Sequence, residues 1–167
     1  MNPHTETSEC QLLGLTARAI ETPEDVESLR QVRNATAWGF SHDTSQISPE
    51  QQRGWWATMR GKVRGWLYRL PAGDVVGFGV LRQTDDGRWW NSVGVLPAFS
   101  GRGYGGAITA DLARRHAGPV WATARRDNPA AIRLHRAADW QQVDSGDPRL
   151  VGFVTRPHVY EANSSTD

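Results

Sequence analysis

The segment from Val93 to Ala107 constrains the fold more than any other part of the sequence. It starts with β-forming residues that end at Pro97, and four of the six residues from Gly101 to Gly106 are glycine before a helix begins. Glycine lets a backbone turn tightly and lets a ligand approach the amide groups without meeting a Cβ atom. The first N–H groups of a helix have no internal acceptor and lie at the positive end of its dipole. The segment therefore predicts a pyrophosphate site between a strand and a helix.

Two other nucleotide-binding patterns also use closely spaced glycines. The Walker loop ends in Gly-Lys-Ser or Gly-Lys-Thr, which this segment lacks. The spacing Gly101-x-Gly103-x-x-Gly106 matches the dinucleotide fingerprint, but that fold opens a parallel βαβ unit at this point. The strands predicted before the loop are instead antiparallel and joined by hairpins. A turn that only caps a helix is the third interpretation, and it does not require so many glycines.

Strand and helix signals alternate along the rest of the chain. Runs of β-forming residues predict strands over 13–20, 65–70, 74–81, 88–95 and 120–125, followed by a closing hairpin at 143 and 150–155. Helices are predicted after the N-caps Thr22 and Ser48, from the glycine loop to about His116, and over 128–138. Short turns join the strands within 65–95, so these strands form an antiparallel meander. This order predicts one α+β domain.

Length and composition narrow the class of protein. At 167 residues the chain fits one domain, which we assign to 13–160 between polar tails, 1–12 and 161–167, that we expect to be flexible. The formal net charge of +1 argues against a protein that coats nucleic acid. Cys10 is the single cysteine, which excludes an internal disulfide and a cysteine cluster, and we predict no metal site. The sequence shows neither a signal pattern nor a membrane-spanning stretch, so we expect a cytoplasmic protein.

Two sequence blocks carry a resemblance to a known family. The motif Val95-x-Pro97, followed by Gly101-Arg102-Gly103-Tyr104-Gly105-Gly106, resembles the acetyl-CoA loop of the GNAT acyltransferases, V-x-P-x-x-R-G-x-G-x-G/A. The block Asn128-x-x-Ala131-x-x-Leu134-His135-x-x-x-Asp139-Trp140 is similar to the family's N-x-x-A-x-x-L-Y-x-x-x-G-F. The resemblance implies a mixed, mostly antiparallel twisted sheet flanked by helices. It also implies a V-shaped splay between the strand before the loop and the next, parallel strand.

The same resemblance implies acetyl transfer from acetyl-CoA and assigns the residues that hold this cofactor. Strand amides at Val93, Gly94 and Val95 would bind the pantetheine arm like an added strand. Amides of the loop and the following helix would bind the pyrophosphate, and the second block would lie near the thiol end. The remaining cofactor residues implied in this way are Gly101, Arg102, Gly103, Tyr104, Gly105, Gly106, Ala107, Asn128 and Ala131.

The chain departs from the family pattern at three positions. Ser100 replaces a usual Arg or Gln, and Asp139 replaces a usual Gly. His135 stands where a tyrosine commonly acts as general acid toward the leaving thiolate. An imidazole can donate that proton because it titrates near neutrality. The alternative is that His135 is a packed or solvent-facing helix residue.

The residue that takes the proton from the amine is not evident in the sequence. Many family members carry a Glu on the strand before the loop, whereas residues 88–93 contain no acid. Asn91 or Ser92 can orient a water there. His42 and Asp43, in the loop between the first two helices, are the other candidates, unless they form a polar surface turn.

The acceptor side is less well defined by the sequence. Trp90 can face the acceptor groove, although core packing is expected for most of the eight tryptophans. Arg33 can contact a substrate phosphate or lie on a solvated helix face. We predict direct attack by the amine in a ternary complex, because no cysteine lies near the motif to form an acyl-enzyme.

The sequence is compatible with several acceptor substrates and with one alternative, non-catalytic function. The first expectation is a small-molecule amine such as an amino sugar, metabolite or drug, followed by a protein N-terminus or lysine, and then a modified nucleobase. The rival is a non-catalytic acyl-CoA-binding or regulatory domain on the same fold. A homodimer is compatible with the resemblance, and neither a nucleic acid nor a membrane partner is expected.

Overall fold

The computed structural model describes residues 13–156. The predicted tails at 1–12 and 161–167, Cys10, and the end of the predicted domain at 157–160 lie outside the described residues. Within 13–156 the order of strands and helices is the one that the sequence predicts.

The centre of the molecule is a seven-stranded sheet with the order β1-β2-β3-β4-β5-β7-β6. Its strands are β1 (Thr16–Ala19), β2 (Val63–Arg69), β3 (Val75–Gln83), β4 (Trp89–Val95), β5 (Val120–Arg125), β6 (Gln141–Val143) and β7 (Leu150–Val154). The helices are α1 (Pro23–Thr36), α2 (Pro49–Thr58), α3 (Tyr104–Arg114) and α4 (Pro129–Ala137), with short 3-10 turns η1 (Ala37–Gly39) and η2 (Pro97–Phe99). The α+β class is confirmed.

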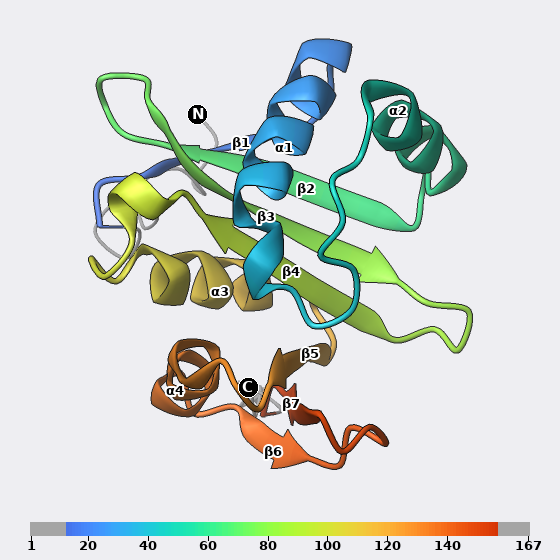
Figure 1. The fold of residues 1–167 in the computed structure, drawn as a ribbon, viewed down its shortest axis with the longest axis vertical. Helices are drawn as coiled ribbons and strands as arrows, with labels where there is room; N and C mark the ends of the chain where they lie inside the picture. The colour runs from blue at the N-terminus through green and yellow to red at the C-terminus, as the bar shows by residue number, and fades with distance from the viewer. Residues whose placement is uncertain (1–12, 157–167) are drawn as a thin grey trace, which may run out of the picture.

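The sheet divides between β4 and β5. These two strands run parallel, whereas the other neighbouring pairs are antiparallel. They pair only at Trp89 with Val120 and at Trp90 with Trp121, and beyond this point they separate. Figure 1 shows β5, β6 and β7 set apart from the group formed by β1 to β4. The predicted V-shaped splay is therefore present.

Local signals fix where the first two helices begin. Thr22 caps α1 in a capping box with Asp25, and Ser48 caps α2 in the same way with Gln51. The first strand is shorter than predicted, because Leu13 and Gly14 have φ angles of 55° and 81° that an extended strand does not allow.

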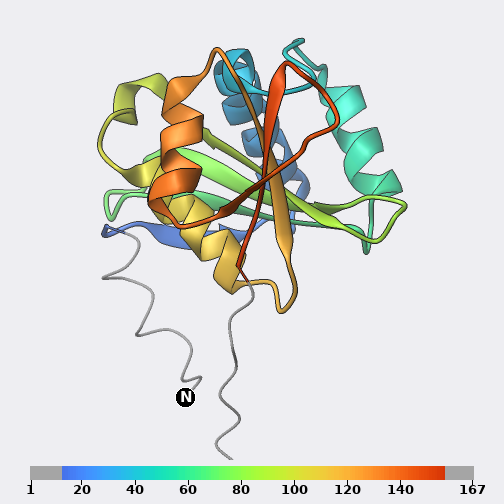
Figure 2. The ribbon, with the colours of Figure 1, turned by 90° about the horizontal axis from the view of Figure 1, so that it is seen from below.

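Hydrophobic cores cover both faces of the sheet. One cluster joins α1 to the sheet through side chains such as Leu29 and Phe78. The other joins α3 through Ile108 and Leu112, which approach the sheet at Gly79, where a Cβ would lie 2.9 Å from Leu112 Cδ2. Figure 2 shows α1 and α2 on one side of β1–β4 and α3 on the other.

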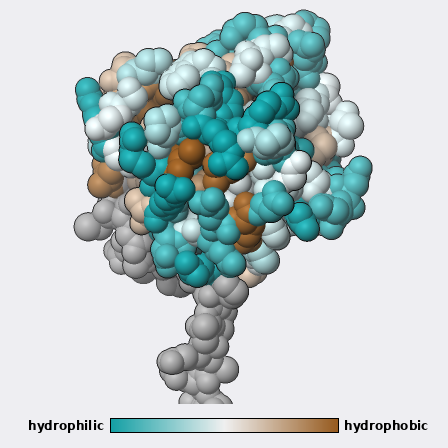
Figure 3. Space-filling view, turned by 60° about the horizontal axis from the view of Figure 1, so that its bottom comes forward, coloured by the Kyte–Doolittle hydropathy of each residue, from teal (hydrophilic) through white to brown (hydrophobic). Residues whose placement is uncertain are grey.

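The tryptophans depart from expectation. Only Trp66 and Trp140 are buried within the described residues, whereas Trp38 is 67% exposed and Trp55 is 37% exposed. Trp89 and Trp56 are partly buried and pack against the two cores, so core packing holds for four of the eight tryptophans rather than for most of them. The outer surface is otherwise largely polar, and Figure 3 shows the hydrophobic areas of one face as small separate spots.

Candidate functional site

A cavity of about 630 Å³ lies at the point where β4 and β5 separate. Its walls come from α1, the 39–47 loop, α2, β3, β4, α3, β5 and α4. The antiparallel register of β3 and β4 puts Trp90 and Ser92 on the same face as Arg82, toward α1 and α2. Asn91 and Val93 lie on the opposite face, toward α3. The cavity therefore reaches both faces of the sheet through the splay.

One side of the splay ends at the N-terminus of α3. Gly101 and Gly103 have φ angles of 75° and 86°, which favour glycine, and Gly103 is an N-cap without a side-chain hydrogen bond. A Cβ on Gly106 would meet no atom within 4 Å. The first-turn N–H groups are therefore open to an anion.

Neighbouring residues of this loop have different roles. A Cβ on Gly105 would lie 3.1 Å from Leu134 Cδ1, so glycine at this position lets α3 pack closely against α4. The Arg102 guanidinium is 5.8 Å from the centre of the Phe99 ring and stays on the surface. Tyr104 begins α3, and its backbone N–H extends the same open end, whereas the Ala107 N–H already donates to the Gly103 carbonyl oxygen at 3.1 Å, so the predicted contact of Ala107 with the cofactor is not available to this amide.

The edge of β4 that faces β5 is free beyond Trp90. Among the described residues, no β5 residue pairs with the part of β4 from Asn91 to Val95, which includes Gly94. Backbone groups along such an edge can hold an extended ligand as an additional strand.

His135 lies in the wall formed by α4 and is only 7% exposed. Its ring stacks on Phe153 with the ring centres 4.8 Å apart, and the Trp140 ring meets it edge-on. Its Nδ1 lies 2.8 Å from the carbonyl oxygen of Ala131. Because a carbonyl oxygen only accepts, Nδ1 carries a proton and the neutral ring has its lone pair on Nε2.

The second ring nitrogen of His135 has a different environment from the first. Nε2 is buried and has no hydrogen-bond partner within the described part of the chain. Burial lowers the pKa of His135, so the imidazole is neutral near pH 7. The amide nitrogen of Asn91, in the wall formed by β4, is also buried without a partner in this range. The residues of the cavity wall thus include a buried proton acceptor and a buried hydrogen-bond donor that lack partners in this range.

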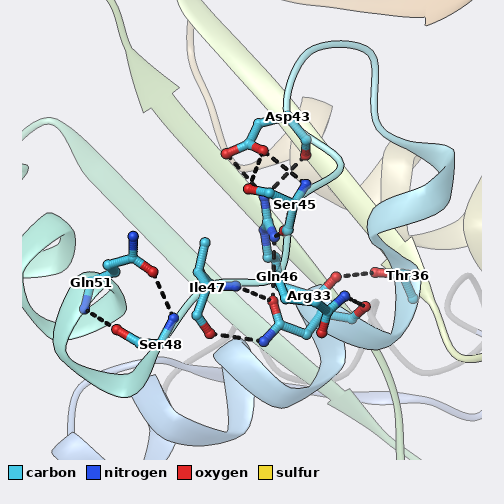
Figure 4. Close-up of polar contacts among 9 residues, drawn as sticks. Arg33, Thr36, Asp43, Ser45, Gln46, Ile47, Ser48 and Gln51 are labelled. Carbon is cyan, nitrogen blue, oxygen red and sulfur yellow. Dashed lines mark hydrogen bonds and ion pairs between the residues drawn. The ribbon is translucent and has the colours of Figure 1, made fainter.

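The loop from Gly39 to Ile47 forms the outer wall on the α1 side, and Arg33 holds it. The Arg33 guanidinium donates to the backbone oxygens of Ser45 and Asp43, the latter at 3.0 Å, and lies 3.5 Å from Asp43 Oδ2 (Figure 4). Hydrogen bonds from Ser45 and the charge of Arg33 lower the pKa of Asp43, which remains a carboxylate. Arg33 and Asp43 therefore face the cavity as a neutral pair.

The same loop reaches across to the other half of the sheet. Ser41 Oγ donates to the Thr123 carbonyl oxygen of β5 at 2.9 Å. Asn128 caps α4 by accepting from the Ala131 N–H at 3.3 Å, and its Nδ2 lies 3.5 Å from the Gly39 carbonyl oxygen. His42 is an exposed residue of the cavity wall. Asn128 therefore orients a helix and a loop, and its predicted contact with a cofactor stays a prediction.

The sequence profile of the Acetyltransferase (GNAT) family matches residues 29–140. The chain belongs to the GNAT acetyltransferase family. Comparison with curated protein sequences finds no match.

Solved structures share the fold of this GNAT chain. A putative acetyltransferase from Salmonella typhimurium with acetyl-CoA is 19% identical, with a TM-score of 0.69, covering 91% of this chain and 99% of that one. A phosphinothricin acetyltransferase from Sinorhizobium meliloti in complex with acetyl-CoA is also 19% identical, with a TM-score of 0.70 and coverages of 86% and 88%. The spermidine N-acetyltransferase from Vibrio cholerae, with CoA and spermine, is 12% identical, with a TM-score of 0.70 and coverages of 85% and 94%.

Sequence reasoning missed part of this GNAT site. Arg82, Gln52 and Thr109 line the cavity but were not candidates. The predicted strand ended at residue 81, whereas β3 continues to Gln83, which places Arg82 opposite Trp90. A longer strand with alternating faces was the signal that could have identified Arg82.

Two further properties of the described residues concern membrane-spanning helices and metal sites. Within 13–156, no helix has the length and apolar character that crossing a membrane requires. Over this range no three His, Cys, Asp or Glu side chains come together as a possible metal site.

Proposed function

We propose that this protein transfers an acetyl group from acetyl-CoA to the primary amine of a small molecule, by direct attack in a ternary complex. The observation that carries the proposal is the cavity that passes through the β4–β5 splay. It connects the side that carries the open α3 N-terminus with the side walled by α1, α2 and the 39–47 loop. The GNAT family membership and the acetyl-CoA-bound structures of the same fold support it.

The residues of the splay fit acetyl-CoA. In this proposal, the amides of residues 102–106 bind the pyrophosphate, since a helix N-terminus attracts a doubly charged anion. The open space at Gly106 leaves room for it, and Gly101 and Gly103 supply the turn. The free edge of β4 holds the pantetheine arm, with Val93 and Val95 in the strand and Ala131 in the wall formed by α4.

Acetyl-CoA supplies an acetyl group activated as a thioester. In the transfer, the amine nitrogen bonds to the acetyl carbon, the carbon–sulfur bond breaks, and CoA leaves as a thiol with the proton that the amine gives up. We assign to Asn91 Nδ2 the donation of a hydrogen bond to the thioester oxygen, because this donor is buried in the cavity without a partner. Ser92, exposed on the other face, can orient a water beside the amine.

We assign to His135 the acceptance of a proton rather than its donation. The donor role that the resemblance implies requires a proton on Nε2, and Nδ1 is already committed to the Ala131 carbonyl oxygen. Donation would therefore start from a doubly protonated imidazolium, which burial disfavours. The neutral ring with a free Nε2 suits a base.

The size of the cavity favours a small acceptor over a protein chain. The 39–47 loop closes its outer side through Arg33 and Ser41, which leaves a space of about 630 Å³. Volumes of this order are typical of small-molecule sites. A protein lysine or N-terminus is the second candidate, and a non-catalytic acyl-CoA-binding domain is the rival.

The test is thermal unfolding of the protein with acetyl-CoA, CoA, NAD or ATP, followed by thiol release in the presence of amines. A ligand that binds only the folded state raises the Tm by mass action. We expect acetyl-CoA and CoA alone to raise it, and an amine to release the thiol. A Tm shift without thiol release from any amine would favour the rival, and no shift with either CoA species would refute the cofactor assignment.

A further inference from the structure

The charged side chains of the cavity are not balanced. Arg33 and Asp43 neutralise each other at 3.5 Å. Arg82 lines the same cavity, and within the described residues its side chain has no ion pair, hydrogen bond or cation–π contact. We propose that the acceptor of this enzyme is an amine that also carries an oxyanion, and that Arg82 binds this oxyanion. The inference rests on the proposed acetyl transfer and specifies its substrate class.

Arg82 stands at a suitable place for such a contact. It is half-buried on β3, directly across from Trp90 on β4, and on the face that looks toward α1 and α2. A planar guanidinium binds carboxylate or phosphonate oxygens with two parallel hydrogen bonds. Partial burial strengthens this attraction, because less water screens the two charges.

The surroundings of Arg82 are shaped for a small organic molecule. The Trp90 indole N–H donates to Thr84 Oγ1 at 3.2 Å, which fixes this ring as an apolar wall. Trp55 and Gln52 of α2 also line the cavity, and Gln52 is only 4% exposed. The acceptor thus meets an aromatic surface, an amide and one unpaired positive charge.

The same charges argue against a polycationic acceptor. Among the residues of the range 13–156 that line the cavity, Asp43 is the only one with an acidic side chain, and Arg33 already neutralises it. A polyamine would bring several positive charges next to Arg82, and no free carboxylate of the cavity wall would balance them. Like charges in such proximity repel each other.

The register of the strands also limits the length of the acceptor. Arg82 pairs with Trp90, so Ser92 is its diagonal neighbour on the same face, about 7–8 Å away between Cα atoms. Ser92 lies in the part of β4 that no longer pairs with β5, and we place the thioester in the gap between these strands. An oxyanion bound by Arg82 therefore lies on the same face of β4 as Ser92, which favours a compact acceptor such as an amino carboxylate.

The experiment compares matched acceptors by acetyl-CoA-dependent thiol release. The set contains α-, β- and γ-amino carboxylates, the corresponding carboxamides, aminoalkyl phosphonates, and spermidine. We expect kcat/KM to be about tenfold to a hundredfold higher for a carboxylate than for its carboxamide, because a charge-assisted hydrogen bond is lost. The phosphonates show which oxyanion the site prefers.

Variants test whether Arg82 is the cause. Arg82→Gln should remove most of the preference for the carboxylate while the Tm shift with acetyl-CoA persists, and Arg82→Lys should keep part of it. Arg60→Gln is the matched control, since Arg60 is exposed and is not part of the cavity wall. It should behave like the wild type.

The outcomes separate this inference from the proposed function. Equal or faster acetylation of carboxamides or spermidine, or an unchanged preference in Arg82→Gln, overturns the role of Arg82 but leaves acetyl transfer standing. An acetyl-CoA Tm shift without thiol release from any amine overturns acetyl transfer, and the inference with it.

Discussion

The two sides of the β4–β5 splay are built in different ways. On the α3 side, the groups that we propose to bind an anion are backbone amides, presented by a glycine-rich turn at the start of one helix. On the α1 side, the walls are side chains from α1, α2, β3 and β4, together with a loop held by Arg33 and Ser41. A backbone site depends on local conformation, whereas a side-chain site depends on where distant segments meet.

This difference indicates how each side can change. An amide cradle tolerates exchange of exposed side chains such as Arg102 or Ser100, provided that the glycine turn remains. The side-chain wall can accept a new substrate through a single exchange, because each element contributes one or two groups. We therefore expect constant cofactor chemistry and a separately adjustable acceptor.

The largest loss of turnover is expected from substitution of His135, a side chain of the cavity wall. His135→Phe preserves an aromatic ring against Phe153 but removes Nε2, so turnover should fall by about a hundredfold while the affinity for CoA stays unchanged. The measurements are steady-state kinetics and CoA titration. His116→Phe is the control, since His116 lies outside the cavity wall.

The pH profile shows which role His135 has. Its pKa is lowered below 6.5 by burial, so a base is active above that lowered pKa, and kcat should fall as pH drops through it. The same shift makes the unfolded chain bind the proton more readily, so folding stability is also lost as pH falls below 6.5. Turnover that instead increases as the pH is lowered through this range would support proton donation.

The next prediction concerns CoA affinity and tests the backbone amides at the N-terminus of α3. Gly106→Asp should weaken CoA binding by about a hundredfold, because a carboxylate beside the cradle repels the pyrophosphate. The fold should persist, since a Cβ there meets no atom within 4 Å and an acid suits a first helical turn. Gly54→Asp, at an open glycine of α2, is the matched control. Wild-type affinity in folded Gly106→Asp would disprove the cradle.

The smallest effect tests the loop that closes the acceptor side. Ser41→Ala removes the hydrogen bond to the Thr123 carbonyl oxygen, so KM for the amine should rise about threefold to tenfold. Affinity for CoA should not change, since the loop bounds the acceptor side. Thr58→Val removes a comparable bond, from Thr58 Oγ1 to the Gly54 carbonyl oxygen at 2.8 Å, outside the cavity and should have no such effect. A parallel loss of CoA affinity would mean that the two halves are coupled.

Local sequence signals predicted the element order and the cofactor half. The caps at Thr22 and Ser48 and the glycine turn before α3 act over a few residues, so they can be recognised without tertiary structure. The limits of β1 were missed because the positive φ angle at Leu13 belongs to a non-glycine residue, which no local rule favours.

The tertiary structure decided the acceptor half. Arg33 was a candidate for a substrate contact, but contacts 10 and 12 residues along the chain bind it to the 39–47 loop. Arg82 gained its place only through cross-strand pairing with Trp90, and His135 acquired its lone pair on Nε2 through burial against β7 and a bond to Ala131. The sequence by itself determined the helix caps and the glycine turn, because these depend on neighbouring residues. Only folding determined which side chains share a cavity and which of them lack partners, because those contacts join residues far apart in the chain.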